Sequence, residues 1–499
     1  MSVAPLVIAL DSSTTGSKAL VVEADGTVVA RGRAEYAMAT PAKDHYEQDA
    51  ADWVTGADTA IAQAVAELDE AGHRRVAALC VTPQRQTFVL CDEAGTPSRP
   101  AILWLDSRAA PQVARLGSRR VHELSGMVPD VTPSLYKLAW LAEHEADALA
   151  SADRVVGVHG YLVHAFTGEW LDSRATADSL GLFDMARLDW AEELLDAAGV
   201  RPDQLTGLVD AAAVLAEVRP EVAERWGLPG PIPMVAGCGD GQAAGLGAGA
   251  TRPDEGYLNL GTAVVAGVHS DAYRHGRVYR TDAAGLPGSY VLEVVQNSGA
   301  YLAGWFRTEL GDPAQGGAPD AELEAAASAI APGSDGLLTL PYWNAVQSQH
   351  WDPRARGAMV GFAGSHGRPA MYRSLLEGIC LETGRNLRAL QADTSTPLTS
   401  LRIMGGGQRS QLWRTIMANC VGLPLVACPE PEVSALGAAT MAMAAVTADS
   451  VAECARAMSR QGDVTEPEAG LVARYEEVSD LQGELYPRLA EVFARLAEG

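Results

Sequence analysis

The order of apolar and polar positions predicts a β-hairpin near the start of the chain. Residues 7–10 form a short apolar run that suits a buried strand, and residues 19–22 form a second run. The residues between the two runs are small or carry hydroxyl groups, and an Asp-Gly pair after the second run marks another turn. The expected hairpin therefore has a polar tip, with Asp11 at its entrance and Lys18 at its exit.

The polar tip has the chemistry of a phosphate-binding turn. Its backbone N–H groups and hydroxyls can bind phosphate oxygens, and the carboxylate of Asp11 can hold a metal ion. A P-loop is excluded, because that motif needs Gly-x-x-x-x-Gly-Lys-Ser/Thr and opens a helix, whereas a strand follows here. A polar β-turn without function is the alternative at this point. The residues of the tip are Ser12, Ser13, Thr14, Thr15, Gly16, Ser17 and Lys18.

Along the rest of the chain, the periodicity predicts alternating strands and helices, and hence an α/β fold. The expected strands lie at residues 28–30, 76–81, 88–91, 101–104, 232–236, 257–260, 263–268 and 401–404. The expected helices lie at about 52–70, 132–144, 157–167, 369–392, 412–420 and from 434 onward, with further helix over 186–230 and one helix over the last thirty residues. The 499 residues favour two domains, 1–250 and 251–499, with a linker at 251–256.

Three of the expected strand ends carry polar residues. Asp11 follows the first strand, the turn 84–87 follows the strand at 76–81, and Asp106 follows the strand at 101–104. Ligands of α/β proteins collect at the carboxyl ends of strands, so we expect these residues to lie together. For Asp106, capping of the segment that follows is an equally good interpretation.

Residues 237–241 place a single carboxylate, Asp240, in a turn made of glycines and one cysteine. A dinucleotide-binding fingerprint is excluded, because the spacing is Gly-x-Gly-x-Gly and Asp240 would turn its negative charge toward a pyrophosphate. A carboxylate that can be approached closely from several sides suits a general base. A turn aspartate that bonds its own backbone is the alternative.

Two more glycine turns follow. Gly261 and Thr262 join two apolar runs and repeat the arrangement of the first hairpin, so the two hairpins could hold a phosphate chain between them. Residues 405–407 are three glycines between a strand and a helix, where backbone can approach a phosphate-bearing or flat ligand closely.

Composition narrows the classes of partner. The formal net charge is −25, which argues against nucleic acid and an anionic membrane surface as partners. Seven scattered cysteines without zinc spacing suit buried free thiols in a reducing compartment. The sequence has no run of the roughly 18 apolar residues that span a bilayer and shows no signal peptide, so a cytoplasmic protein is expected.

As a set, these motifs resemble the FGGY family of carbohydrate kinases. Residues 134–144 and 357–377 are similar to the two signatures of that family, in the right order. The resemblance spans essentially the whole chain and implies an actin-like (ribonuclease H-like) fold of two domains, with ATP in the cleft between them and a sugar deeper in that cleft. The segments that carry it are 11–18, 239–244, 260–262, 351–357 and 405–407.

The resemblance also implies a role for each motif residue. Asp240 would be the catalytic base, and Asp11 together with Asp240 would position Mg²⁺. The expected ATP ligands are Ser13, Thr14, Thr15, Lys18, Gly261, Thr262, Gly405, Gly406, Gly407 and Ser410. The expected sugar contacts are Gln84, Arg85, Gln86, Trp104, Asp106 and Asp240.

The substrate is not decided by these motifs. The turn 83–87 resembles that of glycerol kinases with Gln86 in place of Glu, but the aromatic residue that glycerol kinases have near Thr132 is absent. Residues 46–49 resemble xylulokinases, so a pentulose such as xylulose is expected, with a glycerol- or erythritol-type polyol as the alternative. Two alternatives belong to other functional classes: an actin-like ATPase without a sugar substrate, and a plain binding module. Whether the protein forms a homodimer stays open.

Overall fold

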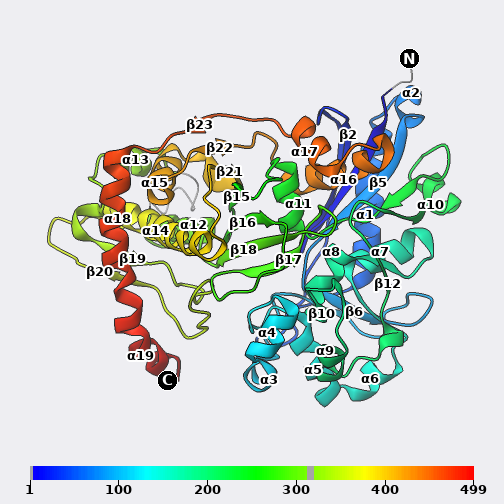
Figure 1. The fold of residues 1–499 in the computed structure, drawn as a ribbon, viewed down its shortest axis with the longest axis horizontal. Coiled ribbons are helices and arrows are strands. Elements are labelled where there is room, and N and C mark those ends of the chain that lie inside the picture. Colours follow the sequence, from blue (N-terminus) through cyan, green and yellow to red (C-terminus); the bar gives the residue numbers. More distant parts are fainter. Residues whose placement is uncertain (1–3, 312–319, 499) are drawn as a thin grey trace.

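The computed structural model describes residues 4–311 and 320–498, which form two large mixed β-sheets surrounded by helices (Figure 1). In the first sheet the strand order is β13-β14-β5-β1-β2-β3. Strand β1 pairs antiparallel with β2 and parallel with β5. These strands are β1 (Leu6–Ser12), β2 (Gly16–Glu23), β3 (Val28–Glu35), β5 (Val76–Pro83), β13 (Val214–Glu217) and β14 (Pro233–Val235).

The second sheet repeats this plan, with the order β17-β18-β16-β15-β21-β22-β23. Strand β15 pairs antiparallel with β16 and parallel with β21, as β1 does with β2 and β5. The α/β class and the predicted repetition of the first hairpin are therefore confirmed. These strands are β15 (Glu255–Leu260), β16 (Val264–Ser270), β17 (Arg280–Ala283), β18 (Tyr290–Gln296), β21 (Ser400–Met404), β22 (Leu425–Ala427) and β23 (Val464–Thr465).

A smaller sheet and several short elements complete the first half of the chain (Figure 1). Its strand order is β4-β7-β6-β8. Its strands are β4 (Glu47–Gln48), β6 (Phe88–Cys91), β7 (Ala101–Ile102) and β8 (Arg154–Gly157). The helices of this half are α1 (Ala50–Ala66), α2 (Glu70–His73), α3 (Ala110–Leu116), α4 (Arg119–Ser125), α5 (Ser134–His144), α6 (Ala146–Ser151), α7 (Val158–Thr167), α8 (Arg174–Ala177), α9 (Glu192–Ala198), α10 (Pro220–Arg225) and α11 (Asp240–Gly247).

Helices on both faces of the first sheet explain why β1 reads as an unbroken apolar run. Side chains alternate between the faces of a strand. Ile8 and Leu10 pack in a core that includes residues of α1, whereas Val7 and Ala9 pack in a second core that includes residues of α16 (Val433–Thr447). A strand that is covered on both faces needs apolar side chains at every position.

Helix α16 belongs to the second half of the sequence but packs on the first sheet, beside α11 (Figure 1). Two glycines permit this close crossing. A Cβ on Gly437 would lie 1.9 Å from the carbonyl oxygen of Ala243, and a Cβ on Gly247 would lie 2.0 Å from that of Val433. The backbones of α11 and α16 therefore touch where the two halves of the chain meet.

The second sheet has its own core, formed with helices that are mostly C-terminal in sequence (Figure 1). The longest helix, α14, is buried along much of its length. Among the described residues, no helix combines the length and the apolar character needed to cross a bilayer. The other helices of this half are α12 (Ala300–Glu309), α13 (Ala321–Ser328), α14 (Arg368–Thr394), α15 (Gln411–Val421), α17 (Val451–Met458), α18 (Ala469–Gly483) and α19 (Leu485–Glu498).

Some predicted elements differ from the structure. The stretch 186–230 is not a long helix, because Gly199, Pro202 and Gly207 interrupt it and leave only α9 and α10 as α-helices. The last thirty residues form two helices, α18 and α19, rather than one. Helix α1 ends at Ala66, before the short helix α2.

Candidate active site

The tip of the first hairpin is a closed polar turn. Both the backbone N–H and the hydroxyl of Ser13 donate to the carbonyl oxygen of Gly16, at 2.9 and 2.8 Å. A side chain at Gly16 would collide with the neighbouring strand, since its Cβ would lie 2.4 Å from the carbonyl oxygen of Ala34. Lys18 leaves the turn and forms a 2.7 Å ion pair with Glu432, which precedes α16.

Hydrogen bonds connect this turn to two of the other polar strand ends. The Thr14 hydroxyl donates to the side-chain oxygen of Gln84 at 3.0 Å, and the indole N–H of Trp104 donates to Thr14 Oγ1 at 2.9 Å. The backbone N–H of Gln84 also donates to the carbonyl oxygen of Ser12 at 2.8 Å. The parallel pairing of β1 with β5 therefore brings these segments together at one edge of the sheet, as expected.

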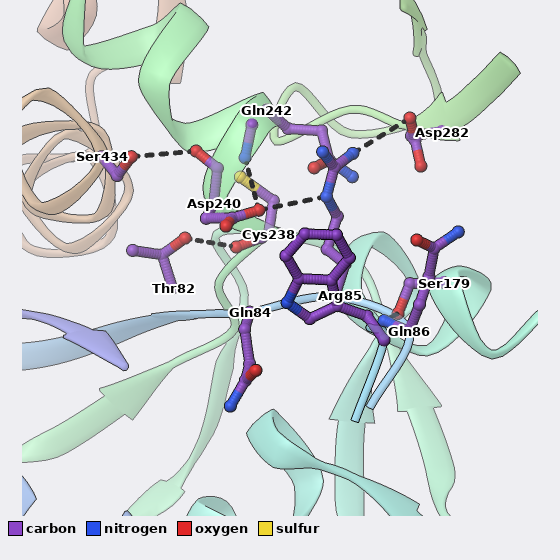
Figure 2. Close-up of polar contacts among 12 residues, drawn as sticks. Thr82, Gln84, Arg85, Gln86, Ser179, Cys238, Asp240, Gln242, Asp282 and Ser434 are labelled. Atoms are coloured by element: carbon purple, nitrogen blue, oxygen red, sulfur yellow. Dashed lines mark hydrogen bonds and ion pairs between the residues drawn. The ribbon is translucent and has the colours of Figure 1, made fainter. Parts of the chain in front are cut away.

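Asp240 is the first residue of α11 and points toward the same edge (Figure 2). Its Oδ1 accepts hydrogen bonds from the backbone N–H of Gly241 at 2.8 Å and from Arg85 Nε at 3.1 Å. Both donors meet the same oxygen, and the side chain is 41% exposed, so Oδ2 is left to meet a ligand. The Ser434 hydroxyl donates to the Asp240 carbonyl oxygen at 3.0 Å and ties this turn to α16.

Asp11 lies at the end of β1 and shares its surroundings with Asp240. Its Oδ1 is buried and has no hydrogen-bond partner among the described residues. Burial and the negative charge of Asp240 raise the pKa of Asp11 to about 7, although Lys18 opposes the shift. Two neighbouring carboxylates, one with an unpaired buried oxygen, suit a cation bound between them.

Arg85 lies between Asp240 and the second sheet. Its guanidinium contacts three carboxylates, those of Asp240 at 3.1 Å, Asp282 at 3.1 Å and Glu293 at 3.0 Å. Figure 2 shows the first two of these contacts. The side chain is 10% exposed. Arg85 was predicted to contact a sugar, and the structure shows in addition that it joins the two halves of the chain.

The two glycine turns of the second half have different surroundings. The carbonyl oxygen of Gly261 accepts the N–H of Ala300 at 2.7 Å, and that of Thr262 accepts the N–H of Gly299 at 3.0 Å, so the second hairpin packs against the start of α12. Gly405 has a φ of +84°, which favours glycine. A cavity of about 610 Å³ lies beside this glycine run and is lined by Gly405, Gly406, Gln408, Arg409, Arg414, Ala427, Cys428, Pro429, Pro431, Gly462 and Asp463.

Comparison with known proteins identifies the family. Residues 6–247 match the N-terminal domain of the FGGY family of carbohydrate kinases, and residues 256–446 match its C-terminal domain. The chain belongs to the FGGY family of carbohydrate kinases. The predicted resemblance is confirmed.

Relatives of this FGGY kinase carry different substrate names. A glycerol kinase of Bordetella parapertussis is 31% identical over 89% of this chain and 90% of its own length. A xylulose kinase of Escherichia coli is 29% identical over 88% of this chain and 90% of its own length. The crystal structure of a xylulose kinase from Rhodospirillum rubrum superposes with a TM-score of 0.92 at 29% identity and covers 98% of this chain and all of that chain. The predicted actin-like fold is thereby confirmed.

The structure brings most of the predicted residues of the FGGY kinase together, but their exposure differs. The side chain of Asp240 is 41% exposed and Trp104 is 36% exposed, whereas Arg85 is 10% exposed and Gln84 and Gln86 are 3% and 5% exposed. Gln86 has a φ of +59°, and its backbone N–H donates to the Ser179 hydroxyl at 3.3 Å (Figure 2). Gln84 and Gln86 therefore shape the turn that presents Arg85.

Asp106 has internal partners in the structure. It was predicted to line the sugar pocket; it is fully buried, and its oxygens accept hydrogen bonds from the Arg108 side chain and from the backbone N–H of Tyr46 at 2.7 Å. Asp106 does not begin a helix, because α3 begins at Ala110, but its Oδ1 accepts the backbone N–H of Arg108 at 3.0 Å and so caps the turn that follows. The paired carboxylate of Asp106 fixes the chain after β7.

Ser410, which was predicted to contact ATP, has an internal role. Its hydroxyl oxygen accepts the N–H of Trp413 at 3.0 Å and so caps α15, and the hydroxyl donates to Glu324 at 2.7 Å. Ser410 thus fixes the junction between the glycine run and α15.

Lys137 was missed by the reading of the sequence. Its ammonium group is fully buried and donates to three backbone carbonyl oxygens, those of Gln86 at 3.2 Å, Leu103 at 3.1 Å and Thr132 at 2.7 Å. Burial lowers the pKa of Lys137 to about 7. This side chain joins the turn that bears Arg85, the end of β7 and the segment before α5. A lysine inside the apolar stripe of the predicted helix was the signal that could have revealed it.

Proposed function

We propose that this carbohydrate kinase transfers the γ-phosphoryl group of ATP to a hydroxyl of a pentulose such as xylulose. The observation that carries the proposal is the environment of Asp240, whose Oδ1 accepts from Gly241 and Arg85 while Oδ2 has no hydrogen-bond partner in the described part of the chain. The hydrogen bonds of Thr14 with Gln84 and Trp104 support the proposal, because they join the expected phosphate turn to the expected sugar-contact residues.

In this proposal Asp240 is the general base. Its Oδ2 accepts the proton of the attacking hydroxyl, while Gly241 N–H and Arg85 hold Oδ1 and so fix the orientation of the carboxylate. Phosphoryl transfer asks a protein mainly for alignment and charge stabilisation. Ser13, Thr14, Thr15 and the Gly261–Thr262 turn would align the phosphate chain, and Lys18 would exchange Glu432 for phosphate oxygens. Bound Mg²⁺–ATP supplies the phosphoryl group and neutralises its developing charge.

The residues fit the two cofactors. Among the described residues, no three His, Cys, Asp or Glu side chains cluster as a closed metal site. Asp11 and Asp240 would therefore share Mg²⁺ with phosphate oxygens and water, which is how this ion is usually held. The cavity beside Gly405 and Gly406 is within the roughly 300–1,000 Å³ range of small-molecule pockets, and we assign it to adenosine. In this scheme residues 1–250 supply the sugar site and the base, and residues 251–499 bind the nucleotide.

Binding of Mg²⁺ with ADP should weaken as the pH falls. The pKa of Asp11 is raised to about 7, so in the metal-free protein this carboxyl group is mostly protonated at pH 6 and mostly ionised at pH 8. Since a metal ion binds the ionised form, its affinity should be about tenfold lower at pH 6 than at pH 8. Calorimetric titration with Mg²⁺ at saturating ADP measures this difference. In Asp11→Asn the affinity should be lower at both pH values and nearly independent of pH; equal affinities for the native protein at pH 6 and pH 8 would contradict the assignment.

An assay of ADP release tests the proposed function. The native enzyme is supplied with ATP, Mg²⁺ and, in turn, D-xylulose, glycerol, erythritol and D-gluconate. We expect the highest kcat/KM with D-xylulose. A higher value with glycerol or erythritol would favour a polyol kinase, which the 31% identity to a glycerol kinase also supports. A rate without substrate that equals the rate with every compound would point to an ATPase.

A further inference from the structure

A buried group of charges beneath Asp240 is not explained by the proposed chemistry. Its members are Arg85 from the first half of the chain and Arg280, Asp282, Glu293 and Tyr257 from strands β17, β18 and β15 of the second. We propose that Glu293 is a positioning residue, which fixes the guanidinium of Arg85 and through it the orientation of Asp240. This inference rests on the proposed role of Asp240 as base.

The contacts of Glu293 meet both of its oxygens. Its Oε2 accepts from Arg85 Nη2 at 3.0 Å and from Arg280 Nε at 2.7 Å. Its Oε1 accepts from the Tyr257 hydroxyl at 2.8 Å. The carboxylate is fully buried, so these side chains replace all of its water. Such a group fixes its partners firmly, because any movement would leave a buried charge without a partner.

Electrostatics make Glu293 the centre of this group. Arg85 and Arg280 both contact Oε2, and the two positive side chains would repel each other without the carboxylate between them. Burial by itself would raise the pKa of Glu293, but Arg85 and Arg280 outweigh it and lower the pKa to about 2. Glu293 therefore carries its charge throughout the neutral range.

The arrangement transmits this constraint to Asp240. The guanidinium of Arg85 is planar, and its three nitrogens face three carboxylates: Nη2 faces Glu293, Nη1 faces Asp282 and Nε faces Asp240. Figure 2 shows the contacts with Asp282 and Asp240. Nη2 donates to both oxygens of Glu293, at 3.0 and 3.3 Å, whereas Nη1 meets Asp282 as an ion pair without hydrogen-bond geometry. Glu293 is therefore the residue of the second half that orients the planar group and with it Nε. The position of the base in the first half thus depends on a carboxylate of the second half.

The glycines on either side of Asp240 agree with this interpretation. A Cβ on Gly239 would lie 2.4 Å from Arg85 Cδ. A Cβ on Gly241 would lie 2.5 Å from Glu293 Oε1 and 2.7 Å from Arg85 Nη2. The turn that bears the base therefore packs directly on Arg85 and Glu293, and any larger residue would displace one of them.

A double-mutant cycle tests whether Glu293 acts through Arg85. With D-xylulose and saturating ATP, Glu293→Gln should lower kcat roughly 10- to 100-fold, the scale of a small misplacement of reacting groups. In the Arg85→Ala background the same change should lower kcat less than about twofold, because the residue that Glu293 positions is already absent. The KM for ATP should stay unchanged in both backgrounds.

Two further variants separate positioning from loss of folding. Glu377→Gln is a matched control: Glu377 is also buried and also bound by an arginine and a tyrosine, Arg373 at 2.8 Å and Tyr475 at 2.9 Å, but it lies on α14 outside the site. It should lower the melting temperature without changing kcat. Tyr257→Phe removes one hydrogen bond to Glu293 and should lower kcat by a smaller factor, again only when Arg85 is present.

The outcomes distinguish this inference from the proposed function. Equal losses of kcat from Glu293→Gln with and without Arg85 would overturn the positioning role, as would an unchanged kcat in a folded Glu293→Gln protein. If Glu293→Gln does not fold, the effect of Tyr257→Phe on kcat is compared with and without Arg85, and this comparison decides in the same way. If the native enzyme phosphorylates none of the four test compounds, the proposed function itself fails.

Discussion

Replacement of Asp240 by asparagine should lower kcat by roughly 10²–10⁴-fold, the usual contribution of a general base. The asparagine oxygen can still accept from Gly241 N–H and Arg85 Nε, so the turn should keep its shape. What is lost is the oxygen that takes the proton of the attacking hydroxyl. Release of ADP at saturating ATP and D-xylulose measures the effect.

A surface aspartate provides the control for this experiment. Asp210 is 64% exposed and pairs with Arg174 at 3.1 Å, away from the cleft. Asp210→Asn should leave kcat within about twofold of the native value, since exposed ion pairs contribute little. A folded Asp240→Asn enzyme with nearly full kcat would exclude Asp240 as the base.

Replacement of Arg85 by alanine should damage both substrate binding and stability. The KM for the sugar should rise much more than the KM for ATP, because Arg85 is proposed to contact the sugar and not the nucleotide. The change also leaves the buried carboxylates of Asp282 and Glu293 with only Arg280 as a cationic partner. Loss of one partner from a buried ion group costs about 3–5 kcal/mol, so the free energy of unfolding should fall by that order.

Kinetics with varied substrate and denaturant unfolding measure the two effects separately. Arg31→Ala is a suitable control, because Arg31 also bridges the two halves through its pair with Glu430 but is half exposed. Its loss should cost no more than about 1 kcal/mol and leave both KM values unchanged. A rise in the KM for ATP alone would contradict the placement of Arg85 at the sugar end.

Local patterns were sufficient for much of the fold and for part of the site. Each of several elements could be predicted from its own contiguous residues, because side-chain alternation and turn chemistry act over a few positions. These elements are the two hairpins, the helix α14 and the strand that leads to Asp240. The same holds for Asp240, because the glycines on either side of it indicated a carboxylate that can be approached closely from several sides.

Other predictions failed or were incomplete because they depended on distant segments. Asp106 follows a strand as Asp11 does, but Arg108 and Tyr46 occupy its carboxylate. In the sequence, Lys137 resembles any other position of an amphipathic helix. Its role in joining three segments becomes visible only where its ammonium group donates to three backbone carbonyl oxygens. Neither the contacts of Asp106 nor those of Lys137 produce a pattern of apolar and polar positions that could be recognised in the sequence.

The sequence by itself determined the α/β class, the hairpins and the family of this kinase, since these depend on neighbouring residues and on motifs. Only the tertiary structure decided how Asp240 is held. Glu293 lies 208 positions after Arg85, and no local rule relates the two. They meet because the two halves of the chain pack together, and burial then makes each charge depend on the other.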